Sequence, residues 1–244
     1  MKPTRDTARP ARGLFTAVAL GQGLWLRGRI EVLPPAAGPV TGSTGSAEDA
    51  ARISVVILGE STAAGCGVDS HEDGFAGSFA ATIAERTGHA VDWTVVGESG
   101  ATSRRIRHKL MPRLSGRYDV AVLLAGANDV LQRRDPAEWR DNLGYIVDQL
   151  GGTCGSVIVV GTPPFPAFPA LPRTLAHYLA ARAARLDVES AAVCAARPGV
   201  HFVTGLADTV DEEFFARDGF HPGPHGYRVW ARSIAEALPV QSSR

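Results

Sequence analysis

The stretch Ile53-Ser54-Val55-Val56-Ile57-Leu58-Gly59-Glu60-Ser61 decides the fold of this chain. Its first six residues are mostly β-branched and show little of the polar alternation of a half-exposed strand, which predicts a strand buried on both faces. Similar runs follow at 91–96, 120–124, 157–160 and 200–203, and helical patterns separate them at 75–86, around 106–110 and at 136–150, 175–196 and 227–238. Strands that alternate with helices predict an α/β fold, here a three-layer α/β/α, flavodoxin-like parallel sheet of about five strands.

The composition fits one folded domain with an N-terminal extension. The 244 residues are 45% hydrophobic and their formal net charge is +0, so no global field favours nucleic acid or an acidic partner. Three widely spaced cysteines, Cys66, Cys154 and Cys194, predict small buried thiols rather than disulfides or a metal site. The histidines show no metal-ligand spacing, and the chain has no G-x-G-x-x-G or Walker A pattern, so we expect neither a metal nor a cofactor.

Residues 1–50 are interpreted as an N-terminal apolar segment followed by a linker. Residues 14–26 form an apolar run, flanked by Lys and Arg, that is too short to span a bilayer comfortably. It fits an interfacial or packed helix, and it also has the size of a secretion signal or anchor. We therefore expect a cytoplasmic or peripheral-membrane protein, with weak membrane association through 14–26, and leave secretion or anchoring open. Residues 34–49 are rich in Pro, Gly, Ser and Thr, which predicts a linker before a domain at 51–240.

Polar residues follow three of the expected strands, namely Ser61, Gly97-Glu98-Ser99-Gly100 and Gly126-Ala127-Asn128. In open α/β sheets, ligands bind beyond the carboxyl ends of the strands, so a strand order of 2-1-3-4-5 would bring these loops together at Ser61. Asp218 and His221 add an acid and a base three residues apart. Each block alone also fits a plain turn or a helix cap, but together they supply the parts needed for acyl transfer.

These blocks resemble those of the SGNH hydrolases, the GDSL esterase/lipase superfamily, over about 53–238. The matching blocks are Gly59-Glu60-Ser61, Gly97-Glu98-Ser99-Gly100-Ala101-Thr102, Gly126-Ala127-Asn128-Asp129 and Asp218-Gly219-Phe220-His221-Pro222. Glu60 stands where the family usually has Asp, a departure with little expected consequence because this side chain is not among the catalytic groups. The resemblance implies the SGNH hydrolase fold over 51–240. It also implies that Ser61 attacks the ester, His221 takes its proton and Asp218 orients His221. The implied oxyanion hole comprises the backbone N–H groups of Ser61 and Gly100 and the side-chain amide of Asn128.

The resemblance implies a serine-dependent esterase or lipase-like hydrolase whose substrate is a small or medium acyl ester. A carbohydrate O-deacetylase or a lysophospholipase would use the same machinery. A non-catalytic, flavodoxin-like binding module is an alternative of a different class. The apolar loop at 163–172 is expected to line the acyl pocket, although a packed connection is another interpretation. An α/β-hydrolase is disfavoured because no G-x-S-x-G elbow surrounds Ser61.

Overall fold

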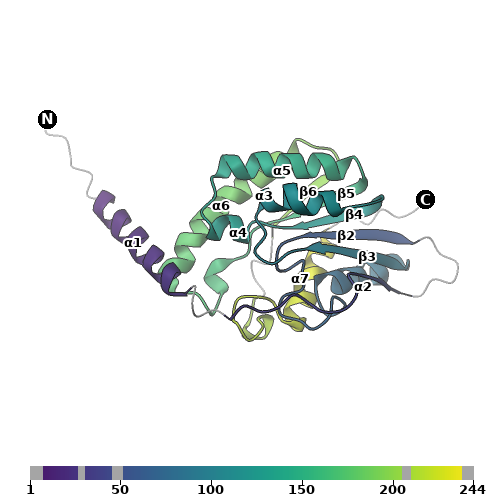
Figure 1. The fold of residues 1–244 in the computed structure, drawn as a ribbon, viewed down its shortest axis with the longest axis horizontal. Coiled ribbons are helices and arrows are strands. Elements are labelled where there is room, and N and C mark those ends of the chain that lie inside the picture. Colours follow the sequence, from purple (N-terminus) through teal and green to yellow (C-terminus); the bar gives the residue numbers. More distant parts are fainter. Residues whose placement is uncertain (1–7, 27–30, 46–51, 205–209, 238–244) are drawn as a thin grey trace.

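A single mostly parallel sheet forms the centre of the computed structural model, which describes residues 8–26, 31–45, 52–204 and 210–237. Its six strands lie in the order β1-β3-β2-β4-β5-β6 (Figure 1). They are β1 Thr41–Thr44, β2 Ile53–Gly59, β3 Val91–Gly97, β4 Tyr118–Leu124, β5 Cys154–Val160 and β6 Val200–Val203. The five strands from β3 to β6 are parallel and follow the predicted 2-1-3-4-5 order, so the expected α/β fold is confirmed.

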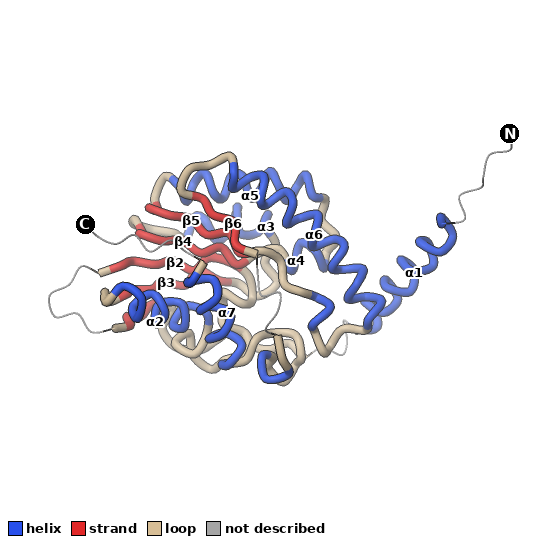
Figure 2. Tube along the Cα trace, turned by 180° about the vertical axis from the view of Figure 1, so that it is seen from behind, coloured by secondary structure: helices blue, strands red, loops and turns tan. Residues whose placement is uncertain are grey.

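Helices cover both faces of this sheet (Figure 2). α2 (Phe75–Thr87) and α7 (Pro224–Glu236) cover one face, and α5 (Pro136–Gly151) and α6 (Arg173–Ala195) cover the other. Short helical segments complete the set at Ser103–Arg105 (α3), Ile106–Leu110, Met111–Arg113, Ala127–Leu131 (α4), Phe165–Ala167 and Glu212–Phe214.

Each face of the sheet packs against its helices in a hydrophobic core, and the side chains of β2 alternate between these two cores. Val55 and Ile57 pack with α2 and α7, whereas Val56 and Leu58 pack on the opposite side with α5 and α6. All four are at most 1% exposed, which explains why the strand shows so little polar alternation in the sequence.

The linker prediction for 34–49 is wrong for residues 41–44, which form β1 at the edge of the sheet. β1 pairs antiparallel with β3, and Gly42 lies opposite Trp93, where the ring occupies the space of any Cβ atom. The segment before β1 is also bound to the domain, since the Ala36 N–H donates to the Ala64 carbonyl at 2.9 Å. Small polar residues suit an edge strand because the backbone supplies its bonds. Residues 46–51 lie outside the described part of the chain.

The N-terminal helix α1 (Ala8–Leu26) projects from the body, and its second half contacts α6 (Figure 1). Ala19 is fully buried, and the Gln22 side-chain oxygen accepts the Leu175 N–H at 3.0 Å. This bond caps a free N–H in the first turn of α6, because the N-cap residue Pro172 has no side chain that could accept it. Among the described residues, no helix is both long and apolar enough to cross a membrane.

Candidate active site

Ser61, His221 and Asp218 form a hydrogen-bonded row at the carboxyl end of β2. His221 Nε2 lies 3.0 Å from Ser61 Oγ, and His221 Nδ1 lies 2.6 Å from Asp218 Oδ2. The turn after Ser61 is tied to α7, since the buried Tyr227 hydroxyl donates to the Cys66 carbonyl at 2.7 Å. This row has the arrangement of a nucleophile, a base and an orienting acid.

The Asp218 carboxylate is fully buried and held in one orientation. Its Oδ1 accepts the backbone N–H groups of Phe220 and His221, both at 3.0 Å, which leaves Oδ2 for the imidazole. Burial by itself raises the pKa of Asp218, but the hydrogen bonds from His221 and these N–H groups outweigh it, so the pKa lies below its usual range. An ionised Asp218 keeps the proton of a neutral His221 on Nδ1 and leaves Nε2 free to accept from Ser61.

Three strand ends converge around Ser61, as the predicted strand order requires. The Glu98 N–H donates to the Gly59 carbonyl at 3.1 Å, and the Glu60 N–H donates to the Leu124 carbonyl at 2.9 Å. The second and third motif loops therefore lie directly beside the first.

The groups expected in the oxyanion hole, Ser61, Gly100 and Asn128, line one cavity together with His221. Gly100 has φ +78°, a conformation that favours glycine, and no heavy atom lies within 4 Å of the place where a Cβ would stand. A substrate can thus approach the backbone at Gly100 closely.

Glu60 has a role that the sequence analysis missed. Its buried carboxylate accepts the Ala127 N–H at 3.1 Å, the Asn128 N–H at 3.1 Å and the Asn128 side-chain amide at 2.7 Å. One amide hydrogen of Asn128 is thus fixed, and the other stays available for a substrate oxygen. The expectation that the Asp-to-Glu departure has little consequence overlooked these contacts. The available signal was a charged residue between a buried strand and Ser61.

Burial raises the pKa of Glu60 to about 7, against the lowering effect of the hydrogen bonds from Asn128 and Ala127. The site therefore contains a carboxyl group that changes charge near neutral pH, directly before Ser61 in the sequence.

Two further carboxylates, one buried and one partly buried, brace the loops around the site. Asp129 accepts the backbone N–H and the hydroxyl of Ser103 at 2.8 and 2.6 Å, which ties the third motif loop to the helix after the second. Asp187 of α6 accepts the N–H and the hydroxyl of Thr162, both at 2.9 Å, and so fixes the loop after β5. Burial raises the pKa of each carboxyl group, although the bonds from Ser103 and Thr162 lower it.

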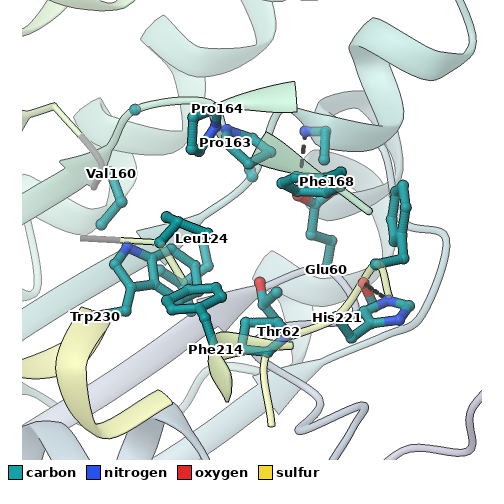
Figure 3. A pocket seen from close by; sticks show the side chains of 17 residues that line it. Glu60, Thr62, Leu124, Val160, Pro163, Pro164, Phe168, Phe214, His221 and Trp230 are labelled. Atoms are coloured by element: carbon teal, nitrogen blue, oxygen red, sulfur yellow. Dashed lines mark hydrogen bonds between the residues drawn. The ribbon is translucent and has the colours of Figure 1, made fainter. Parts of the chain in front are cut away.

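A small apolar cavity of about 60 Å³ opens beside Ser61 and His221. Figure 3 shows Pro163 and Phe168 on one side of it and Phe214 and Trp230 on the other. The loop expected to line a pocket at 163–172 therefore does so through Pro163, Pro164 and Phe168. No group of three or more His, Cys, Asp or Glu side chains that could hold a metal ion occurs within the residues that the structure describes.

The sequence of this chain is similar to those of known proteins. The model of the GDSL-like Lipase/Acylhydrolase family matches residues 57–229. The GDSL-like esterase Rv1075c of Mycobacterium tuberculosis (strain ATCC 25618 / H37Rv) is 32% identical over 196 residues, which cover 76% of this chain. The chain spans only 62% of that relative's length.

Solved structures support the fold. TesA is 20% identical with a TM-score of 0.58, covering 74% of this chain and 95% of the TesA chain. The Clostridium thermocellum family 3 carbohydrate esterase is 18% identical with a TM-score of 0.55, covering 76% of this chain and 92% of the esterase chain. At such identities the likeness concerns the fold, and it confirms the predicted SGNH hydrolase fold.

Proposed function

This chain belongs to the GDSL-like lipase/acylhydrolase family, a family of carboxylic ester hydrolases, and from that premise we propose that it hydrolyses esters of short acyl groups through Ser61, His221 and Asp218. The observation that carries the proposal is the position of His221, whose ring nitrogens lie 3.0 Å from Ser61 Oγ and 2.6 Å from Asp218 Oδ2. A binding module would have no need for a base that reaches a serine hydroxyl in this way.

In the proposed reaction, His221 Nε2 takes the Ser61 proton while Ser61 Oγ attacks the ester carbonyl. The negative charge that develops on the carbonyl oxygen is stabilised by the N–H groups of Ser61 and Gly100 and by the Asn128 amide. His221 then gives the proton to the leaving alcohol, and an acyl group remains on Ser61. Water attacks this acyl-enzyme with His221 as base, which releases the carboxylic acid and restores Ser61.

The small cavity supports a short acyl group. Its volume of about 60 Å³ and its apolar walls suit a few carbon atoms and offer little to a charged or sugar-like acid. A carbohydrate O-deacetylase is the second candidate, because an acetyl group fits the same cavity.

The direct test is labelling of Ser61 by an organophosphate together with hydrolysis of p-nitrophenyl acetate. We expect one phosphoryl adduct on Ser61, and Ser61→Ala should lose both the adduct and about a million-fold in kcat. Ser115→Ala, at an exposed serine away from the cavity, is the matched control and should keep both. If Ser61→Ala retains more than about a tenth of kcat, far above the expectation for a lost nucleophile, Ser61 is not the nucleophile.

A further inference from the structure

A second and larger cavity starts at the same catalytic residues and runs between α1 and α6. Its volume is about 560 Å³, within the range of roughly 300–1,000 Å³ that is typical of small-molecule sites. We call it the α1–α6 groove. Its inner end is formed by Ser61, Gly100, Asn128 and His221. Most of its walls are apolar and include Leu20, Leu24, Leu131, Leu171, Leu175 and Leu179, while Glu31, Gln132 and Arg133 add polar groups.

The α1 wall lies outside the part of the chain that matches the family model, which begins at residue 57. The wall is anchored by buried Ala19 and by the bond from the Leu175 N–H to Gln22. Gly23 lines the groove, and a Cβ added there would stand 3.8 Å from Leu175 Cδ1. The missing side chain at position 23 therefore keeps this part of the groove open.

Helix α1 carries apolar side chains both in the groove and outside it. Leu24 lines the groove and is 71% exposed. Phe15, Val18 and Trp25 lie on other faces of the same helix and are 42%, 43% and 54% exposed.

We propose that the α1–α6 groove binds a long alkyl chain on the alcohol side of the ester, so that the substrate is a lipid-like ester with a short acyl group. This inference rests on the proposed function. The two substituents of an ester carbonyl leave Ser61 in different directions, and the two cavities meet at Ser61 and His221. The small cavity accepts only a short group, so a long group must lie in the groove. In the proposed reaction the alcohol leaves first, while the acyl group stays bound to Ser61. We therefore assign the larger cavity to the alcohol.

The experiment compares alkyl acetates from ethyl to decyl acetate with Gly23→Leu and Gly21→Leu. Wild-type kcat/KM should rise by up to about fourfold for each methylene that is buried. Gly23→Leu fills the groove, so it should leave ethyl acetate unchanged and lower kcat/KM for decyl acetate by about 10- to 100-fold, the effect of two to three lost methylenes. Gly21→Leu is the matched control, since no atom lies within 4 Å of its added Cβ and the position is exposed. It should follow the wild type.

Three results would overturn the groove assignment: equal effects of the two variants, an equal loss with ethyl and decyl acetate, or length dependence confined to the acyl side of the ester. If Gly23→Leu does not fold, Leu24→Glu serves the same purpose. It places a charge in the groove at a largely exposed side chain and should also lower kcat/KM for decyl acetate alone.

Binding of 1-decanol to the Ser61→Ala protein, measured by calorimetry, separates the two proposals. We expect binding that Gly23→Leu weakens and Gly21→Leu does not. Decanol binding without hydrolysis of any ester by the wild type would refute the proposed reaction and leave the groove assignment standing. Hydrolysis of ethyl acetate without decanol binding would refute the groove and leave the reaction standing.

Discussion

Replacing Glu60 tests whether a buried carboxylate holds the oxyanion hole in place. Glu60 accepts three N–H groups, two from the backbone at the start of α4 and one from the Asn128 side chain. Glu60→Ala removes all three acceptors. Glu60→Gln is the matched control, because its single oxygen can keep both bonds to Asn128 while its NH₂ group faces the Ala127 N–H.

The structure sets the size of both effects. A buried donor without a partner costs about 1–3 kcal/mol, so Glu60→Gln should lose stability in that range. Glu60→Ala leaves more donors without a partner and should lose more. The additional loss should be small, because water that enters the vacated space accepts some of these hydrogen bonds. Loss of one oxyanion donor lowers kcat by about a hundred- to a thousand-fold, which is the upper limit for freeing the Asn128 amide. We expect Glu60→Ala to lower kcat by more than tenfold within that limit, and Glu60→Gln to lower it less.

The assay is a double-mutant cycle of Glu60→Ala with Asn128→Ala, using p-nitrophenyl acetate and urea denaturation. If Glu60 acts through Asn128, the double variant should have the kcat of Asn128→Ala alone, because the amide to be positioned is already absent. Fully additive losses of kcat would refute the reasoning. So would wild-type kcat in Glu60→Ala with a stable fold.

The charge of Glu60 adds a pH signature. Its pKa rises from 4.5 to about 7 in the folded protein, so the folded state holds this proton more tightly than the unfolded chain. This contribution is complete below pH 4.5 and is lost as the pH rises through 7, and it amounts to roughly 3 kcal/mol. The wild type should lose stability relative to Glu60→Gln by about this amount between pH 4.5 and 8. If the difference in unfolding free energy between the wild type and Glu60→Gln does not change with pH, the raised pKa of Glu60 is contradicted.

Three further predictions follow from the same structure. Asn128→Ala should lower kcat by about a hundred- to a thousand-fold with little change in KM, and a raised KM with unchanged kcat would assign Asn128 to ground-state binding. Asp218→Asn should lower kcat by about 10⁴-fold because the wrong imidazole tautomer is favoured. The lowered pKa of ionised Asp218 also stabilises the wild-type fold at neutral pH, and this stabilisation is lost as the pH falls below about 3.8, the usual pKa of an aspartate. Asp218→Asn should remove it. A loss of kcat of less than tenfold would contradict the triad. Deletion of residues 1–45 should lower Tm by several degrees, since it removes strand β1, which pairs with β3 beside Trp93, and the Gln22 side chain that caps α6. An unchanged Tm in a calorimetric scan would show that these contacts do not stabilise the fold.

The parallel sheet and the convergence of the motif loops were predictable from sequence because both depend on local patterns. Runs such as 53–58 and 120–124 mark buried strands, and the order of strands and helices restricts the topology to a few choices. Polar residues directly after such runs must lie at the carboxyl end of the strands of a parallel sheet. The sequence alone therefore places Ser61 and Asn128 near each other.

Features that depend on contacts between distant residues and leave no local pattern in the sequence could not be predicted. Thr41–Thr44 has no apolar alternation, so nothing local distinguishes an edge strand from a linker, and only the exposed edge of β3 makes it a strand. The cap that Gln22 places on Leu175 joins residues 153 positions apart. Helix α1 likewise forms part of a cavity at Ser61 only through its contact with α6.

Three acidic residues of the motif blocks share one physical role in this structure. Glu60 joins the first loop to the third, Asp129 joins the third to the helix after the second, and Asp218 fixes His221. Each carboxylate loses hydration on burial, and each recovers hydrogen bonds from two or three N–H or O–H donors on another loop or on its own turn. Such bonds hold the donors in position before the substrate arrives, which is the condition under which they stabilise an oxyanion most strongly. The loops thus act as one preorganised unit, so loss of the bond between Glu60 and Asn128 should affect the transition state more than the binding of substrate.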